Sequence, residues 1–291
     1  MVIYMKIGIC STDFQPTSVD ALFEKMRALR FTATQFSFGS VLGSEEMLPE
    51  YNEELLAEID RAAKKHAVEI VAINATFNML DPIDARREEN IRRMDVMCRA
   101  ARRLGCPILT LCTGSRNPDS GWVWHEDNSK PESWALMISV MRRLVAYAEQ
   151  YDLTLVVETE AANVVQTPQL ARKMLDEIGS PHLKMVIDCA NLFLPGTAHR
   201  ENAAATIQSA FDAFGAEIAL AHGKDIADSD GIEFAPVGTG IVDYDLFLRL
   251  LYQYGYRGAL IEHGIYKEKL MPACVDFLSE KIKSSQYDLE E

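Results

Sequence analysis

Four segments in the second half of the chain decide its fold: residues 153–158 (LTLVVE), 183–188 (LKMVID), 218–222 (IALAH) and 259–262 (ALIE). Each is a short, mostly apolar run that ends on one Glu, Asp or His. Runs that are continuous rather than alternating are typical of strands covered on both faces, as in a parallel sheet. The four segments therefore predict four buried parallel strands, each with one charged or imidazole side chain at its carboxyl end.

The first half of the chain has four more runs of this kind: Lys6–Cys10, Ala33–Phe36, Ile70–Asn74 and Ile108–Cys112. Longer segments with apolar residues at helical spacing lie between the runs. Gly105 and Gly179 stand where two such helices would end, and Thr167 followed by Pro168 stands where another would begin. The chain thus alternates predicted strands with predicted helices.

Eight strand–helix units predict an α/β fold, namely a (β/α)8 TIM barrel. We expect one domain over residues 1–291, in which residues 284–291 form a polar tail. A doubly wound open sheet is the alternative, but neither a GxGxxG segment nor a P-loop follows any predicted strand. The pattern therefore favours the closed barrel.

Composition narrows the classes of function. The net charge of −14 disfavours nucleic-acid binding, because the densest arginine stretches are interrupted by acidic residues. No apolar run approaches the roughly 18 residues of a membrane span, and the start MVIYMKIGIC is too short for a signal peptide. The six cysteines are scattered without a CxxC pair, which predicts reduced thiols. We expect a cytoplasmic protein with a small-molecule substrate, no nucleic-acid partner and no membrane partner, and homo-oligomerisation is left open.

The strand ends indicate a metal site. The active site of such a barrel lies at the carboxyl ends of its strands, so Glu158, Asp188, His222 and Glu262 are expected to converge there. Three carboxylates repel one another unless a cation neutralises them. One imidazole with three carboxylates suits one divalent ion, with Mn²⁺ as the first choice and Mg²⁺, Co²⁺ or Zn²⁺ as alternatives. Each residue alone also fits a helix cap or an ion pair in the barrel, and Glu160 is an alternative to Glu158 as the ligand.

Five further motifs carry a family resemblance: VVETE (156–160), VIDCANL (186–192), AHGKD (221–225), PVGTGIVDY (236–244) and YRGALIEH (256–263). With them the chain resembles the xylose-isomerase-like barrel family of sugar isomerases and epimerases, which also includes inosose dehydratases and apurinic endonucleases. The resemblance runs from KIGIC (6–10) to LIEHG (260–264). It implies that Glu158, Asp188, His222 and Glu262 hold the metal in the manner of ketose 3-epimerases, and that Glu158 and Glu262 are the catalytic acid–base pair.

The chain departs from those epimerases near the substrate. They carry a His shortly after the residue that matches Asp188 and an Arg shortly after the residue that matches His222, whereas this chain has Asn191 and Lys224-Asp225 in these places. The resemblance therefore supports the metal site better than it supports any particular substrate.

Further residues are candidates for substrate binding. Lys224 would meet a substrate oxygen or phosphate, or else pair with Asp225 or Asp188. Trp124 and His125, with Trp122, lie on the long loop 113–130, where aromatic faces either stack on a sugar ring or anchor the loop. Asn74 would donate to a hydroxyl, and Arg116 would bind a phosphate or carboxylate. Glu160 and Asn191 complete the predicted set, whereas His263 is ambiguous.

Together these observations predict a divalent-metal-dependent isomerase or epimerase that acts on a ketose, a sugar phosphate or a related polyol. The metal would acidify a C–H bond next to a bound carbonyl, and one glutamate would remove the proton while another returns it. A metal-dependent lyase of the inosose-dehydratase kind is the first alternative. An apurinic-site metal nuclease is disfavoured because it needs more histidines and a DNA-binding face, and a non-catalytic sugar-binding barrel is the last alternative.

Overall fold

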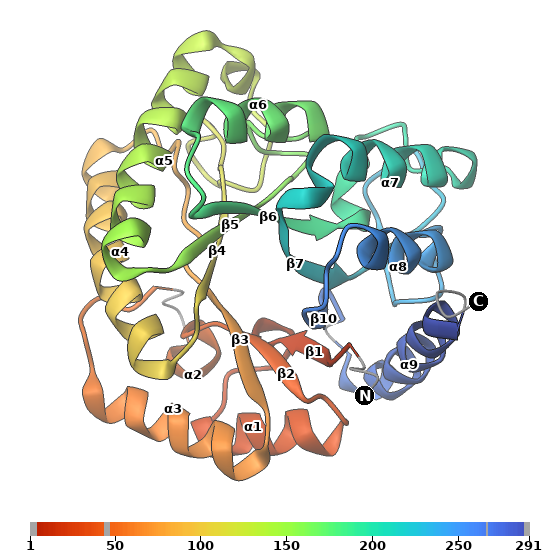
Figure 1. Cartoon of the computed structure of the whole chain (residues 1–291). Helices are drawn as coiled ribbons and strands as arrows, with labels where there is room; N and C mark the ends of the chain where they lie inside the picture. Colours follow the sequence, from red (N-terminus) through yellow and green to blue (C-terminus); the bar gives the residue numbers. More distant parts are fainter. Residues whose placement is uncertain (1–4, 44–46, 266, 288–291) are drawn as a thin grey trace.

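A closed barrel of eight parallel strands forms the centre of the molecule (Figure 1). The computed structural model describes residues 5–43, 47–265 and 267–287. Around the barrel the strands follow the order β1-β10-β7-β6-β5-β4-β3-β2, and β1 pairs with β10 to close the ring. Closure excludes the open sheet and confirms the predicted (β/α)8 barrel. The strand bounds are β1 Ile7–Cys10, β2 Ala33–Phe36, β3 Glu69–Asn74, β4 Ile108–Cys112, β5 Thr154–Glu158, β6 Leu183–Asp188, β7 Ile218–Gly223 and β10 Leu260–Glu262.

Helices surround the barrel on its outside (Figure 1). Their bounds are α1 Val19–Ala28, α2 Gly39–Leu42, α3 Glu53–His66, α4 Asp84–Leu104, α5 Pro131–Tyr151, α6 Pro168–Ile178, α7 Arg200–Phe214, α8 Tyr244–Gln253 and α9 Met271–Tyr287. Gly105 and Gly179 follow α4 and α6 at φ of 68° and 67°, which glycine adopts readily. The side chain of Thr167 accepts a hydrogen bond from the amide of Leu170, as expected for the start of α6.

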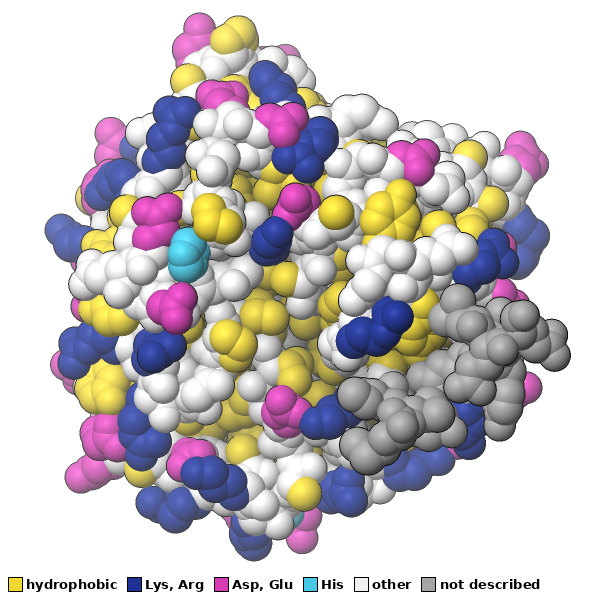
Figure 2. Space-filling view, viewed as in Figure 1, with side chains coloured by type: hydrophobic (Ala, Val, Ile, Leu, Met, Phe, Trp, Pro, Cys, Tyr) yellow, Lys and Arg dark blue, Asp and Glu magenta, His cyan; other side chains and the backbone are white. Residues whose placement is uncertain are grey.

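The polar tail predicted over residues 284–291 has to be corrected at its start. Residues 284–287 continue helix α9, and Ser285 is buried. Residues 288–291 lie outside the described residues. Within the described ranges, no helix combines the length and the apolar character needed to cross a bilayer. Over the face drawn in Figure 2, Lys and Arg side chains are interspersed with Asp and Glu, and no basic patch gathers on it.

Two apolar layers position the site. The larger layer fills the space between strands and helices, and a smaller one fills the inside of the barrel with residues such as Val156, Val186, Leu220 and Ile261. Because side chains alternate along a strand, a residue two positions after one of these inner residues also points inward. This alternation decides which strand-end side chains reach the mouth of the barrel.

Candidate active site

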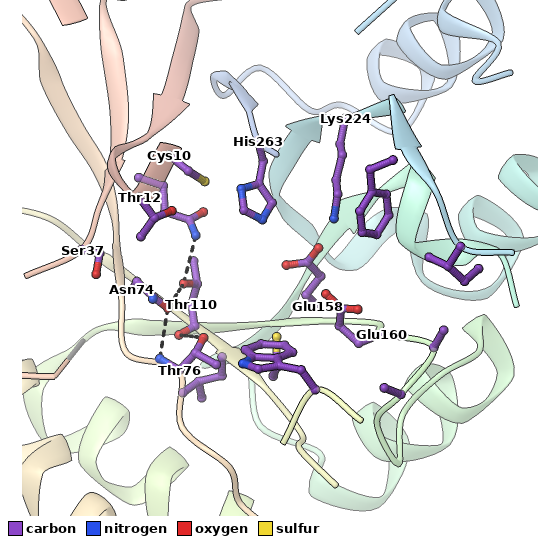
Figure 3. A pocket seen from close by; sticks show the side chains of 18 of the residues that line it. Cys10, Thr12, Ser37, Asn74, Thr76, Thr110, Glu158, Glu160, Lys224 and His263 are labelled. Atoms are coloured by element: carbon purple, nitrogen blue, oxygen red, sulfur yellow. Dashed lines mark hydrogen bonds between the residues drawn. The ribbon is translucent and has the colours of Figure 1, made fainter. Parts of the chain in front are cut away.

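A pocket of about 660 Å³ opens at the carboxyl ends of the barrel strands (Figure 3). Strand residues form its floor: Gln35 from β2, Asn74 from β3, Thr110 from β4 and Glu158 from β5. This is the end of the barrel at which TIM-barrel enzymes carry their active sites. The pocket is therefore the candidate active site.

Three of the predicted ligands come together beside this floor. The ligand atoms of Glu158, Asp188 and His222 all lie within 4.8 Å of one another, and the three side chains are buried. His222 Nδ1 is 3.3 Å from Asp188 Oδ2 and 3.6 Å from Glu158 Oε1. The three residues occupy inward positions of β5, β6 and β7, two places after Val156, Val186 and Leu220 respectively.

Hydrogen bonds orient this cluster in the way that a metal site requires. His222 Nε2 donates to Gln35 Oε1 at 2.9 Å, which leaves Nδ1 directed at the carboxylates. Asp188 Oδ1 accepts the amides of Ala190 and Asn191, so Oδ2 is the oxygen that faces His222. Supporting hydrogen bonds of this kind orient metal ligands in known sites. Two carboxylates and one imidazole, buried and already oriented, fit a divalent cation.

The charges in the cluster shift its pKa values. Burial lowers the pKa of His222, but the charge of Glu158 and the hydrogen bond to Asp188 outweigh burial and raise this pKa to about 9. Burial raises the pKa of Asp188, and the charges of Lys224 and His222 reverse this effect and hold it below its ordinary value. In the absence of a metal, the imidazole thus carries the positive charge that the carboxylates require.

A buried lysine and amide extend the cluster toward Glu160. Lys224 Nζ donates to Asn191 Oδ1 at 2.9 Å, and Asn191 Nδ2 donates to Glu158 Oε1 at 2.5 Å and to Glu160 Oε1 at 2.8 Å. Lys224 Nζ is also 3.9 Å from Asp188 Oδ2. Burial, followed by the charge of Glu158, raises the pKa of Glu160 to about 8, so this carboxyl is largely protonated at neutral pH. The network connects both glutamates through one amide.

Glu262 does not join the three clustered ligands. The residue before it, Ile261, belongs to the inner layer of the barrel, so Glu262 occupies the outer face of β10. A Cβ placed on its register partner Gly223 would lie 3.2 Å from Leu278 of α9, which confirms the direction of this face. Neither carboxylate oxygen of Glu262 has a hydrogen-bond partner among the described residues. Burial, followed by the charge of Asp13, raises the pKa of Glu262 to about 9.

His263 takes the inward position at the end of β10. Its ring lines the pocket (Figure 3), and its centroid is 5.5 Å from that of the His222 ring. His263 Nδ1 is 3.4 Å from Asp13 Oδ1, while Asp13 Oδ2 accepts the amide of Ile265 at 2.6 Å. The residue that was ambiguous in the sequence therefore faces the pocket, and its neighbour Glu262 does not.

The remaining candidates divide into two groups. Lys224, Glu160, Asn74 and Trp124 line the pocket, and Asn191 lies just beneath it. Arg116 and His125 are engaged elsewhere: Arg116 Nη1 donates to Leu80 O at 3.3 Å, and His125 Nδ1 accepts the amide of Asp127 at the start of the 3₁₀ helix Glu126–Ser129.

Sequence reasoning missed Gln35, Thr110 and Phe234, all of which line the pocket. Thr110 is a polar residue between Leu109 and Leu111, which is a signal that the sequence offered, whereas Gln35 follows the polar Thr34 and does not stand out. Phe234 lies in the short hairpin of β8 (Asp225–Ile226) and β9 (Phe234–Ala235), for which the sequence has no strong pattern.

The AHGKD and GTG motifs also have a structural role. The carboxylate of Asp225 accepts backbone N–H groups from four residues of the following loop: Ile226, Gly238, Gly240 and Val242. A Cβ at Gly240 would lie 2.2 Å from Ile226 O and 2.3 Å from Asp225 Oδ1. Asp225 thus folds the loop that follows β7, and glycine is needed at position 240 for its close approach.

The closed parallel barrel defines a TIM-barrel protein, and the carboxylate–histidine cluster at its mouth consists of residue types that could hold a metal ion. The chain belongs to the xylose isomerase-like TIM barrel family, whose sequence model matches residues 23–280. A comparison with curated proteins gave no match.

Solved structures share the fold over nearly the whole chain. A D-tagatose 3-epimerase-like protein superposes with a TM-score of 0.77 at 18% identity, covering 98% of this chain and 100% of that one. A xylose isomerase domain protein from Planctomyces limnophilus gives 0.75 at 18% identity, with coverage of 99% and 100%. A xylose isomerase-like TIM barrel protein from Mycobacterium smegmatis, in complex with magnesium, gives 0.71 at 15% identity, with 97% of both chains covered.

Proposed function

We propose that the protein is a divalent-metal-dependent isomerase or epimerase that acts on an unphosphorylated ketose or related polyol. The observation that carries this proposal is the convergence of Glu158, Asp188 and His222 at the floor of the pocket. The similarity in fold to a D-tagatose 3-epimerase-like protein supports it. So does the magnesium bound by another protein of the same fold.

Glu158, Asp188 and His222 would hold one divalent ion, with Mn²⁺ as the first choice and Mg²⁺, Co²⁺ or Zn²⁺ as alternatives. Such an ion, when bound, polarises a carbonyl oxygen and so acidifies the neighbouring C–H bond. Glu158 lines the pocket, so an ion held by the three residues would lie next to the space that a substrate occupies.

Two side chains that line the pocket, Glu158 and His263, would carry the proton transfer. Glu158 would remove the proton, and its Oε1 is held in position by Asn191. The predicted partner, Glu262, faces the other side of β10, so we assign the return of the proton to His263, whose Nδ1 lies 3.4 Å from Asp13 Oδ1. Glu160, largely protonated at neutral pH, and Lys224 would donate hydrogen bonds to substrate oxygens.

The side chains of the pocket favour an unphosphorylated substrate. Among its described lining residues Lys224 is the only Lys or Arg, and its Nζ donates to Asn191 Oδ1. Arg116, the residue that would have bound a phosphate, lies outside the pocket and contacts the carbonyl of Leu80. The described lining residues thus offer a phosphate one ammonium group and no guanidinium, so the sugar-phosphate substrate is disfavoured. Each described group of candidate ligands holds at most one histidine, which also disfavours the nuclease.

Exchange of substrate hydrogen with solvent tests the proposal. The metal-loaded protein is incubated in D₂O with D-fructose, D-tagatose and L-ribulose, and deuterium incorporation next to the carbonyl is followed by ¹H NMR. We expect exchange with at least one sugar, and its loss after EDTA treatment or in Asp188→Asn. A product that absorbs in the ultraviolet as an enone would identify a lyase instead. Absence of exchange with the whole panel would overturn the proposal.

A further inference from the structure

The rim of the pocket is apolar, in contrast to its polar floor. Trp122, Trp124 and Phe234 are 54%, 40% and 45% exposed, although each lines the pocket. Pro195 and Ile232 line the same rim. Large apolar side chains that gather around a concave site and remain exposed mark a surface that a ligand covers.

The first wall of this rim is a loop that is held by groups other than its indoles. Ser115 Oγ donates to Val123 O at 2.6 Å, and Asn163 Nδ2 donates to Gly121 O at 3.2 Å. These bonds hold the backbone on both sides of Trp122, whose ring is more than half exposed. The loop is therefore anchored to the barrel by these backbone contacts and not by its indole rings. The rings remain free to present their faces to the pocket.

The second wall is the β8–β9 hairpin. Phe234 pairs with Ile226 in its register, and its ring lies under Lys224 Nζ at 3.5 Å. Phe234 thus contacts the buried Lys224 while nearly half of its side chain remains exposed. The two walls come from loops after different strands, β4 and β7, so the rim presents aromatic surface from two sides of the mouth.

The pocket is larger than one sugar ring requires. At about 30 Å³ for each water-sized group, 660 Å³ accommodates about 20 such groups, whereas a hexose has about a dozen non-hydrogen atoms. A pyranose ring has an apolar face of C–H groups that stacks on aromatic rings. We propose that the substrate is a glycoside with two sugar rings: the reacting keto sugar lies on the polar floor, and the second ring stacks in the rim of Trp122, Trp124 and Phe234. The placement of the reacting sugar rests on the function proposed above.

A pair of sugars that differ only in the second ring tests this inference. Lactulose is D-fructose with a galactosyl group on O4, and both can be titrated by calorimetry into the metal-loaded protein. We expect lactulose to bind about tenfold more tightly than D-fructose, and Trp122→Ala to reduce this ratio to about one. Saturation-transfer NMR should show contact with the galactosyl protons in the wild type and lose it in Trp122→Ala.

Two variants serve as controls. Val123→Ala changes an exposed side chain of the same loop that does not line the pocket, and it should keep the tenfold ratio. Trp122→Phe retains an aromatic ring and should keep most of the ratio. Equal affinity of the wild type for the two sugars, failure to bind lactulose, or an equal loss for both sugars in Trp122→Ala would each overturn the inference. Binding without hydrogen exchange would instead reject the proposed function and leave the second-ring site standing.

Discussion

The substitution Glu262→Gln tests whether the Glu262 carboxyl is buried and protonated on the outer face of β10. Burial, followed by the charge of Asp13, raises the pKa of Glu262 from its ordinary value of 4.5 to about 9. Between these values the folded protein holds a proton that the unfolded chain has lost, so the free energy of unfolding falls as pH rises. One pKa unit corresponds to about 1.4 kcal/mol, so the wild type should lose about 3 kcal/mol between pH 4.5 and pH 7 from this group.

Glutamine does not titrate, so the variant lacks this loss. We expect the difference in unfolding free energy, Glu262→Gln minus wild type, to increase by about 1.4 kcal/mol per pH unit, or about 4 kcal/mol from pH 5.5 to pH 8.5. Urea unfolding followed by tryptophan fluorescence, with EDTA present, measures both proteins at each pH. A buried amide without partners costs about 1–3 kcal/mol at every pH. The test therefore uses the change of the free-energy difference with pH and not its value at any one pH.

The control is Glu58→Gln, which removes an exposed carboxylate from α3 and should follow the wild type within about 0.5 kcal/mol at all pH values. Parallel curves for Glu262→Gln and the wild type would refute the reasoning, because they would mean that the Glu262 carboxyl ionises as readily in the folded protein as in the unfolded chain.

Three further outcomes follow from the site. Asp188→Asn should weaken Mn²⁺ binding at least a hundredfold by calorimetry, whereas the Mn²⁺ affinity of Glu262→Gln should stay within a few-fold of the wild type. Comparable losses in both variants would restore Glu262 as a ligand. Gln35→Ala, which removes the acceptor of His222 Nε2–H, should weaken Mn²⁺ binding about 10- to 100-fold by competition with a chelating dye, and an unchanged affinity would contradict the role given to Gln35. Gly240→Ala should lower the unfolding free energy by about 2 kcal/mol in urea, and a change under 0.5 kcal/mol would show that the loop relaxes around the added Cβ.

The barrel could be predicted because its signals are local. Each of the eight apolar runs forms a strand, and the ends of β5 and β6 at Glu158 and Asp188 were read directly from the change in residue type. Glycines with positive φ ended two helices as expected. These features depend on hydrophobicity and backbone sterics within a few residues, which the sequence contains in full.

Loop side chains were harder to place. Arg116 and His125 follow β4 in a segment whose path depends on hydrogen bonds with distant residues, such as that between the amide of Arg116 and Asn128. Trp122 and Trp124 come from the same loop and do reach the pocket. Nothing in the residue types separates the two pairs, because the side-chain directions in a loop follow from its tertiary contacts.

By itself, the sequence determined the strands, their order of alternation with helices and the residue type at each strand end. Only the tertiary structure decided which face of a strand each of those residues occupies. In β5, β6 and β7 the last ligand-type residue points inward, whereas in β10 the inward residue is His263 and Glu262 faces α9. The reason is that successive side chains of a strand point to opposite faces. A shift of one residue therefore moves a side chain from the mouth of the barrel to its outer layer. An apolar run as short as ALI, covered on both faces, carries no record of that register.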